Sequence, residues 1–193
     1  MKIKIGVSNR HIHLCKKDFD ELFGSTELSV LKNLSQQGEF ASTLTVSIKT
    51  NKGVLSDVRI IGPLRDRTQV EISRTDAYKL GLNPPVRESG EITGSEKITV
   101  VGPKGELNLD EGCIIATRHI HINPKQVEMY GLTGKEYVDV LVGGEKQAIL
   151  KDVSIKVSDP AYYEMHIDTD DANANLIKNG DVATILGIDD KNS

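Results

Sequence analysis

The sequence predicts a mainly β protein built from two similar β-rich halves. Ten short segments are rich in valine and isoleucine, and many alternate apolar and polar residues as half-buried strands do. Turn-forming residues separate them, for example Asn51-Lys52-Gly53, Gly62-Pro63 and Gly143-Gly144. The motif Arg-His-Ile-His occurs at residues 10–13 and again at 118–121. Many short strands with tight turns favour barrels or sandwiches, and the repeated motif indicates a repeated structural unit.

The predicted elements follow from these patterns. The strands are expected at residues 2–8, 42–50, 54–61, 69–73, 97–101, 112–122, 137–143, 147–157, 161–167 and 182–188. Four short helices are expected at residues 16–23, 75–80, 124–130 and 170–179. Pro124 suits the first turn of a helix. Asp168 or Thr169 can cap the last helix, and Gly180 can end it.

A second, weaker repeat defines the two halves. Residues 70–77 resemble residues 165–172, and in this alignment Glu71 falls on His166. We therefore expect one half over residues 1–85 and the other over residues 95–190. The Pro- and Gly-containing stretch between them is the expected boundary.

Composition excludes several classes of protein. The chain has 193 residues, of which 38% are hydrophobic and 27% charged, as in soluble globular proteins. A net charge of −4 and 4% aromatic residues argue against nucleic-acid binding. No apolar run approaches the roughly 20 residues of a membrane helix, and no signal peptide is recognisable. Two cysteines, Cys15 and Cys113, are too few for a zinc ribbon, and we expect them to stay reduced in the cytosol.

The five histidines form the strongest functional signal. They are His11, His13, His119, His121 and His166. Random placement of five histidines would give roughly 0.1 His-x-His pairs, whereas the sequence has two. Residues i and i+2 of a strand point to the same face, so each pair offers two imidazoles to one point. Unrelated core or surface histidines are the alternative interpretation, and the duplication argues against it.

A third ligand for each pair comes from the second repeat. Glu71 would complete a His-His-Glu set with His11 and His13, and His166 would complete a His-His-His set with His119 and His121. Three protein ligands and one open position are typical of catalytic zinc sites. Cys15 follows His13 by two residues and could join a site, but a small buried residue is the preferred interpretation.

Arg65 is a candidate phosphate ligand. It lies on the loop that precedes the strand of Glu71, and a guanidinium can hold phosphate through two hydrogen bonds. A solvated surface arginine is the alternative. Loop placement beside a candidate metal ligand favours a functional role.

These residues carry a resemblance to a known family. The chain resembles the PduL-type phosphotransacylases, also called phosphate propanoyltransferases, from residue 3 to about residue 187. The motifs that carry the resemblance are Ser8-Asn9-Arg10-His11-Ile12-His13-Leu14, Gly62-Pro63-x-Arg65-x-x-Thr68-Gln69-Val70-Glu71-Ile72-Ser73, Pro85-Val86-Arg87-Glu88-Ser89-Gly90, Arg118-His119-Ile120-His121 and Met165-His166-Ile167-Asp168-Thr169-Asp170.

The resemblance implies two six-stranded β-barrels capped by short helices, with a two-zinc site between them. It implies the reaction of acyl-CoA and phosphate to give acyl phosphate and CoA, with propanoyl-CoA or acetyl-CoA as the short-chain substrate. The implied zinc ligands are His11, His13, Glu71, His119, His121 and His166. Repeat symmetry assigns Glu71 to the zinc of His11 and His13, whereas interlocked halves could exchange it. The implied phosphate-binding catalytic residue is Arg65, and the implied CoA contacts are Val7, Ser8, Asn9, Lys52, Arg59 and Asn173.

The resemblance also bears on cellular location. Relatives associated with bacterial microcompartments, for example in propanediol degradation, often carry an N-terminal targeting extension. The first expected strand begins at residue 2, which leaves no room for one. We therefore expect a cytoplasmic protein, with the lumen of a bacterial microcompartment as the alternative. The sequence leaves open whether the protein forms a homo-oligomer.

Two other functions remain as alternatives at this point. A zinc site could activate water, which would make the protein a thioester or phosphoester hydrolase. A non-catalytic metal-binding module is the third candidate, and three-ligand sets argue against it. No Ser-His-Asp or reactive-cysteine arrangement is evident, so we expect phosphate to attack the thioester directly.

Overall fold

Strands dominate the computed structural model, which describes residues 1–24, 26–159 and 162–187. The chain divides into two compact units. We call residues Asn9–Ala116 the central unit. The terminal unit holds both chain ends and consists of Met1–Ser8 and Thr117–Ser193. Each unit contains a six-stranded closed barrel, which confirms the predicted fold class.

The barrel of the central unit runs in the order β4-β5-β2-β6-β9-β8, and β8 closes it by pairing with β4. Helices α1 (Lys16–Phe23) and α2 (Arg74–Leu80) belong to this unit. Its strands are β2 (His11–His13), β3 (Val30–Asn33), β4 (Phe40–Lys49), β5 (Val54–Gly62), β6 (Gln69–Glu71), β7 (Val86–Arg87), β8 (Glu96–Val101) and β9 (Glu106–Ala116). Strands β3 and β7 lie outside the closed barrel.

The barrel of the terminal unit runs in the order β1-β13-β10-β12-β11-β14. Helices α3 (Pro124–Met129) and α4 (Thr169–Ala174) complete this unit. Its strands are β1 (Lys2–Ser8), β10 (His119–Ile122), β11 (Tyr137–Val142), β12 (Ala148–Val157), β13 (Glu164–Asp168) and β14 (Val182–Ile185).

The two barrels have the same topology. Strand β2 pairs in parallel with β5 and antiparallel with β6. Strand β10 pairs in the same two ways with β12 and β13. The parallel pair β6–β9 likewise corresponds to the parallel pair β13–β1. The sequence repeat is therefore also a structural repeat.

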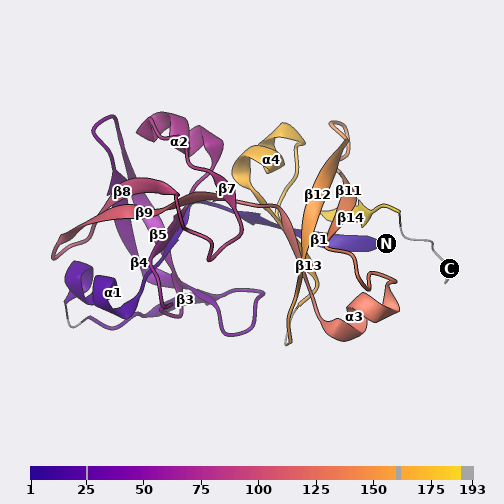
Figure 1. Ribbon diagram of the computed structural model, residues 1–193, viewed down its shortest axis with the longest axis horizontal. Helices are drawn as coiled ribbons and strands as arrows, with labels where there is room; N and C mark the ends of the chain where they lie inside the picture. The colour runs from indigo at the N-terminus through magenta and orange to yellow at the C-terminus, as the bar shows by residue number, and fades with distance from the viewer. Residues whose placement is uncertain (25, 160–161, 188–193) are drawn as a thin grey trace. The chain divides into compact units, whose positions relative to one another are not determined.

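The first strand of each repeat is exchanged between the units. Strand β1 opens the first repeat but pairs with β13 and β14, beside which Figure 1 draws it. Strand β9 opens the second repeat but pairs with β6 and β8 of the central unit. Each strand that leads into an Arg-His-Ile-His motif thus closes the barrel of the other repeat.

The compact units consequently differ from the expected halves 1–85 and 95–190. The expected boundary lies inside the central unit, where β7 pairs with β9 and the Ile115 amide donates to the Pro85 carbonyl at 3.0 Å. Strands β8 and β9 are needed to close the central barrel, so the chain cannot divide before them. The expected limits at residues 161, 188 and 190 lie outside the described residues.

The helix bounds match the prediction to within one residue, except at one end. Helix α1 has the expected bounds, and Asp168 caps α4 by accepting a hydrogen bond from the Asp171 amide at 2.9 Å. Helix α4 ends at Ala174 rather than 179. The turn that follows puts Leu176 in the left-handed region at φ 55°, which a continuing helix does not allow.

The strand predictions missed four features. Strand β2 (His11–His13) lies outside every expected range. The expected strand 112–122 is two strands, because the chain passes from one unit to the other between Ala116 and Thr117. Strand β9 also begins earlier, at Glu106. Strands β3 and β7 are exposed along their whole length, so they lack the apolar alternation that marks a half-buried strand.

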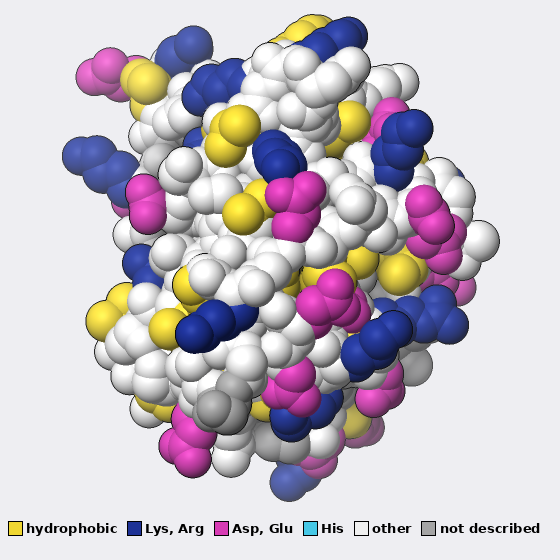
Figure 2. Space-filling view, turned by 90° about the vertical axis from the view of Figure 1, so that its left-hand side faces the viewer, with side chains coloured by type: hydrophobic (Ala, Val, Ile, Leu, Met, Phe, Trp, Pro, Cys, Tyr) yellow, Lys and Arg dark blue, Asp and Glu magenta, His cyan; other side chains and the backbone are white. Residues whose placement is uncertain are grey.

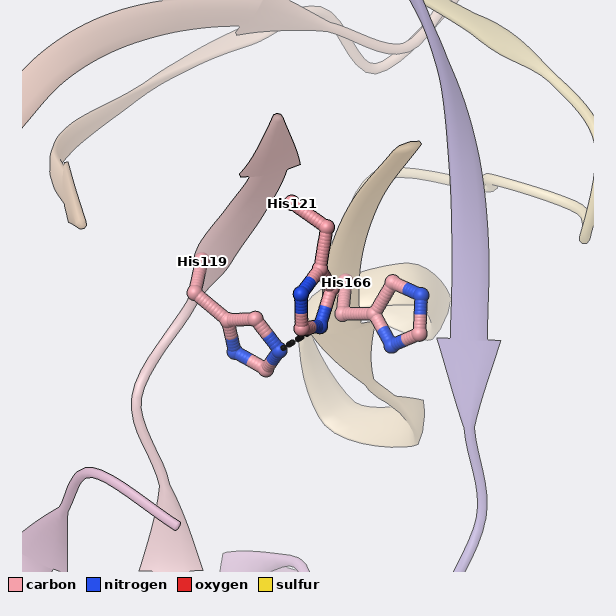
Figure 3. Close-up of side chains that lie close together, drawn as sticks. All are labelled: His119, His121 and His166. Carbon is pink, nitrogen blue, oxygen red and sulfur yellow. Dashed lines mark hydrogen bonds between the residues drawn. The ribbon is translucent and has the colours of Figure 1, made fainter. Parts of the chain in front are cut away.

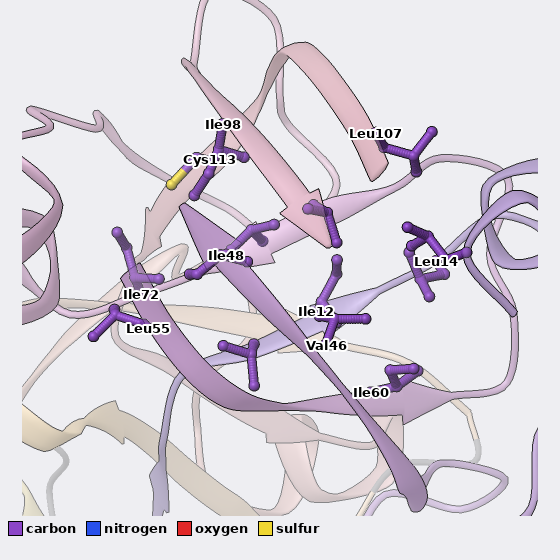
Figure 4. Close-up of a cluster of buried hydrophobic side chains, with 14 of the residues drawn as sticks. Ile12, Leu14, Val46, Ile48, Leu55, Ile60, Ile72, Ile98, Leu107 and Cys113 are labelled. Atoms are coloured by element: carbon purple, nitrogen blue, oxygen red, sulfur yellow. The ribbon is translucent and has the colours of Figure 1, made fainter. Parts of the chain in front are cut away.

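Each barrel has its own apolar core. Figure 4 shows part of the central core, where Ile12, Ile48 and Ile60 are fully buried. In the terminal core Ile120 and Ile122 are fully buried as well. Ile12 and Ile120 separate the two histidines of each motif, and their burial turns the histidines to the opposite face of the strand.

Charged side chains of both signs are mixed on the face drawn in Figure 2. The helices in the part of the chain that the structure describes are too short or too polar to cross a bilayer.

Candidate metal centres

Strand register brings each third candidate ligand next to a histidine pair. In the central unit His11 lies directly opposite Glu71 across the antiparallel β2–β6 pair. In the terminal unit His119 lies directly opposite His166 across β10–β13. Side chains in such positions have Cβ atoms about 4.5–5.5 Å apart, so they share one small volume. The alignment of Glu71 with His166 in the sequence thus corresponds to equal places in the barrels.

The first cluster consists of His11, His13 and Glu71. One possible ligand atom from each residue lies within 4.8 Å of the others. His11 Nε2 is 3.5 Å from Glu71 Oε2, and the two imidazole centroids are 5.1 Å apart. His13 Nδ1 is buried without a hydrogen-bond partner among the described residues. An unpartnered buried ring nitrogen is a feature that a bound ion would explain.

The second cluster consists of His119, His121 and His166, which Figure 3 shows converging from two neighbouring strands. Their possible ligand atoms also lie within 4.8 Å of one another. The Nε2 atoms of His119 and His121 are 3.1 Å apart. Two ligand nitrogens at about 2.0–2.1 Å from a tetrahedral zinc lie about 3.3–3.4 Å apart. The spacing therefore fits a zinc ion.

The first histidine of each pair is held by the same backbone contact. His11 Nδ1 lies 2.8 Å from the Asn9 carbonyl oxygen, and His119 Nδ1 lies 2.9 Å from the Thr117 carbonyl oxygen. A carbonyl only accepts, so each Nδ1 carries the proton and donates it. This leaves the Nε2 lone pair of both rings directed into the cluster. Metal-binding histidines are usually oriented in this way.

Burial keeps several of these rings neutral. Burial, with the nearby His11 and Arg65, lowers the pKa of His13 to about 2. Burial, with Lys156 second, lowers the pKa of His119 to about 2, and burial with His166 lowers that of His121 to about 4. A metal binds the neutral imidazole. These three side chains are therefore in the ligand form at pH 7.

Arg65 is anchored beside the first cluster. Its amide donates to the Leu14 carbonyl at 2.9 Å, which ties the loop to the segment just after His13. Its guanidinium donates to Glu39 at 3.0 Å and to the Ser89 hydroxyl at 3.2 Å. The arginine is about one-third exposed, so an anion from solvent can reach it.

A hydrogen-bonded chain that the sequence did not predict joins Arg65 to Glu71. Ser89 accepts from Arg65 and also from the Gln69 amide at 2.9 Å, and Gln69 donates to Glu71 at 2.6 Å. Gln69 and Ser89 belong to motifs that carried the family resemblance, which was the available signal. Their contacts depend on the fold around β6 and could not be read from spacing.

The remaining predicted residues are divided between the units. Asn9, Lys52 and Arg59 lie in the central unit, and Val7, Ser8 and Asn173 lie in the terminal unit. Arg59 pairs with His11 across β2–β5, and its guanidinium donates to the carbonyls of Ser42 and Thr43, both at 3.0 Å. Lys52 lies in the turn between β4 and β5. A shared CoA site for these residues stays a prediction.

Cys15 lies outside both clusters and is half-buried rather than fully buried. Its amide donates to the Thr68 hydroxyl at 3.0 Å, and the residue precedes α1 as its N-cap. The structure therefore gives Cys15 a place at the start of a helix.

Two arginine–aspartate pairs are further repeated features. Arg10 makes two hydrogen bonds to Asp76, at 2.9 and 2.7 Å, and Arg118 makes two to Asp171, at 2.7 and 2.9 Å. Each pair joins the start of a His-x-His strand to the first turn of α2 or α4. The recurrence of both residue types in the two repeats was the sequence signal for these contacts.

The sequence is similar to those of known proteins over most of its length. The sequence profile of the phosphate propanoyltransferase family matches residues 4–178. A phosphate propanoyltransferase of Thermotoga maritima is 47% identical over 186 residues, covering 95% of this chain and 89% of the relative. That of Shewanella putrefaciens is 48% identical, covering 95% and 88%. That of Priestia megaterium is 48% identical, covering 95% and 85%.

The duplicated barrels with their two histidine clusters are thus those of an enzyme, an acyltransferase. The chain belongs to the phosphate propanoyltransferase family, as its match over most of its length establishes. The resemblance inferred from the motifs is confirmed.

Proposed function

We infer that this protein interconverts a short-chain acyl-CoA plus phosphate with acyl phosphate plus CoA, and that it depends on zinc. Propanoyl-CoA is the expected substrate, in keeping with the names of the relatives, and acetyl-CoA is a second one. The observation that carries the zinc dependence is the pair of three-residue clusters with atoms within 4.8 Å. A structural zinc site is usually closed by a fourth Cys or His ligand. Among the described residues each cluster has three candidate ligands, which supports a catalytic role.

The proposed zinc ligands are His11, His13 and Glu71 in the central unit and His119, His121 and His166 in the terminal unit. When bound, zinc would polarise the thioester carbonyl or hold the departing thiolate.

Arg65 would bind and orient phosphate. Its guanidinium now pairs with Glu39, and a doubly charged phosphate is a stronger partner for it. In the proposed reaction a phosphate oxygen forms a bond to the carbonyl carbon and the carbon–sulfur bond breaks. The electron pair stays on sulfur, and the proton of hydrogen phosphate goes to the CoA thiolate. Orientation of the two reactants by the protein can contribute several kcal/mol.

A covalent acyl-cysteine is disfavoured by the environment of Cys113. This thiol is fully buried, and burial together with nearby Glu96 raises its pKa to about 12. Attack requires the thiolate, which is scarce at such a pKa. Cys113 is therefore excluded as the nucleophile, and direct attack by phosphate in a ternary complex remains the proposed route.

The test is CoA release from acetyl-, propanoyl- and butanoyl-CoA, with and without phosphate and with and without a chelator. We expect release to need phosphate and to fall on metal removal. Metal analysis should find about two zinc ions per chain. Release without phosphate would support the hydrolase alternative, which the family relationship does not favour. Zinc content near zero in active protein would contradict the zinc dependence.

A comparison of two variants tests the ligand assignment. His166→Ala should lose zinc and activity, because it leaves a two-histidine cluster. Cys15→Ala should keep both, because Cys15 lies outside the clusters. The reverse result would overturn the assignment. The cytoplasmic location and the oligomeric state stay predictions.

A further inference from the structure

We propose that Glu164 is a positioning residue for His166. Its carboxylate accepts the Nε2 proton of His166 and so leaves the Nδ1 lone pair for the metal. Gln69 serves Glu71 in the complementary way in the other barrel. This inference rests on the proposed zinc dependence.

The two positioning residues occupy equivalent places. Gln69 lies opposite His13 across β2–β6, and Glu164 lies opposite His121 across β10–β13. Each stands two residues before the third candidate ligand and on the same face of its strand. Both barrels therefore place four polar side chains together. Three are the candidate ligands of the cluster, and the fourth, Gln69 or Glu164, contacts Glu71 or His166.

The chemistry of the fourth residue changes with that of the third. In the central unit the third residue is a carboxylate, and the Gln69 amide donates to Glu71 Oε1 at 2.6 Å. In the terminal unit the third residue is an imidazole, and Glu164 Oε2 lies 3.1 Å from His166 Nε2. A carboxylate ligand needs a donor, whereas an imidazole ligand needs an acceptor for its second nitrogen. Each barrel supplies the kind that its ligand needs.

The orientation of the Gln69 amide is fixed independently. Its Oε1 accepts a hydrogen bond from the Gly90 amide at 2.7 Å. Because a backbone amide only donates, the oxygen must face Gly90 and the NH2 group must face Glu71. Gln69 therefore acts as a donor to the candidate ligand.

The orientation of His166 agrees with binding through Nδ1. Figure 3 shows one of its ring nitrogens on the side of His119 and His121 and the other directed away from them. Nε2 is the atom in contact with Glu164 and also with the Tyr162 hydroxyl, at 2.5 Å. If Nε2 accepted a hydrogen bond instead, the ring proton of His166 would lie on Nδ1, which could then not bind a metal. An ionised Glu164 only accepts, so it selects the Nε2–H form.

Gly6 makes room for this contact. It lies opposite His166 on β1, and a Cβ atom at this position would be 2.9 Å from Glu164 Oε2 and 3.2 Å from His166 Nε2. Contacts this close would displace the carboxylate or the ring. The absence of a side chain at Gly6 thus preserves the Glu164–His166 contact.

The two clusters also become electrically equivalent. The first has two histidines and one carboxylate ligand, Glu71. The second has three histidines and, through Glu164, one carboxylate in contact with a ligand. Each would set one negative charge against the two positive charges of zinc. The exchange of Glu71 for His166 is therefore offset by the exchange of Gln69 for Glu164.

The experiment compares Glu164→Gln with the wild type and with the control Tyr162→Phe. Zinc affinity of the two sites is measured by competition with a chromophoric chelator. Glu164→Gln should weaken one site about 10–100-fold and leave the other unchanged, since loss of a partner of this kind has that effect. Tyr162→Phe removes the other contact of Nε2 and should keep both sites. In a matched variant, Gln69→Glu should weaken the site of His11, His13 and Glu71, because a like charge replaces the donor to Glu71.

A spectroscopic measurement on the wild type does not depend on how the variants fold. In protein loaded with cadmium-113, couplings between metal and imidazole identify the bound nitrogen. We expect Nδ1 for His166 and Nε2 for His119. Binding of His166 through Nε2, or an unchanged affinity in Glu164→Gln with a loss in Tyr162→Phe, would overturn the inference. Wild-type protein that binds no zinc would instead overturn the zinc dependence on which the inference rests.

Discussion

At the residue scale, the five histidines differ in how they are held although their sequence motifs are alike. His11 and His119 donate through Nδ1 to a backbone carbonyl two residues earlier. His166 contacts side chains through Nε2 instead. The i, i+2 spacing thus selects which face a ring lies on, and the neighbours select which nitrogen is available.

The role of Arg65 gives the first prediction. Arg65→Ala should raise the KM for phosphate and lower kcat, with kcat/KM for phosphate reduced about 10- to 150-fold. A charge-assisted hydrogen bond is worth about 1.5–3 kcal/mol, which corresponds to that range. Steady-state kinetics with varied phosphate measure it, and zinc content should not change. Arg67→Ala is the control, since Arg67 is an exposed arginine of the same loop. Equal effects of the two substitutions would mean that Arg65 is a surface charge and does not bind phosphate.

The neutral histidines give the second prediction, for the metal-free protein. His13, His119 and His121 have pKa values lowered to about 2, 2 and 4, whereas an unfolded histidine has a pKa near 6.5. Between these values the unfolded chain binds more protons. The free energy of unfolding should therefore be flat above about pH 6.5 and fall below it, by up to about 1.4 kcal/mol per pH unit for each histidine.

Urea denaturation of metal-free protein at pH 7 and pH 5 measures this dependence. His119→Gln should show a shallower fall than the wild type, because it removes one of the titrating groups. An identical fall in both proteins would mean that His119 does not contribute.

Much of each candidate site could be predicted at this scale, and its surroundings could not. The period of a strand assigns His11 and His13 to one face, and the repeat assigns Glu71 and His166 to equivalent places. The partners of those ligands depend on which residues lie opposite one another across strands. Register is a property of the folded barrel, so the contact of Gln69 with Glu71 was visible only in the structure.

At the element scale, the two arginine–aspartate pairs attach each His-x-His strand to a helix. They have the same bidentate geometry but different exposure. The Asp76 side chain is 2% exposed, whereas that of Asp171 is 20% exposed. The environment of the carboxylate should therefore decide how much each pair contributes to stability.

This difference gives the third prediction. Arg10→Ala should lower the free energy of unfolding by about 3 kcal/mol, because it leaves the buried Asp76 carboxylate unpaired. Arg118→Ala should cost about 1 kcal/mol, because water can reach Asp171. Urea denaturation of both metal-free variants at pH 7 compares them. Equal losses would show that burial of the carboxylate does not control the cost.

Helices and central strands were easier to predict than the edges. Helix α3 has Asn123 as N-cap, Pro124 in its first turn and a capping box with Gln126, which are local signals. Strands β3 and β7 are exposed, and their sequences carry no alternation. Their positions are set by the barrel strands with which they pair.

At the scale of the whole molecule, the sequence repeats and the compact units have different boundaries, because each repeat contributes its first strand to the other barrel. The central unit is one continuous segment, Asn9–Ala116, and contains all six strands of its barrel. The sequence half 1–85 lacks β8 and β9 and includes β1, whose partners lie in the terminal unit. Internal repeats in a sequence identify similar pieces, but they do not reveal which copy of a strand completes which barrel.

The fourth prediction follows. A fragment of residues 9–116 should fold alone with a cooperative urea transition, because its barrel and apolar core are complete. A fragment of residues 1–94 should not, because its barrel would have an open edge with unpaired backbone groups. Circular dichroism during denaturation distinguishes them. Cooperative folding of 1–94, or failure of 9–116, would contradict the assignment of β9 to the central barrel.

The exchanged strands also bear on how such a chain could arise. A protein with a single copy of the repeat could not close its own barrel with its first strand, since that strand pairs in the other unit. Two copies together could close both barrels, each lending its first strand to the other, as in a domain-swapped dimer. Joining the copies in one chain would replace a concentration-dependent association by an intramolecular one. Gene duplication and fusion of a strand-swapping ancestor would therefore account for both the repeated sequence and the crossed strands.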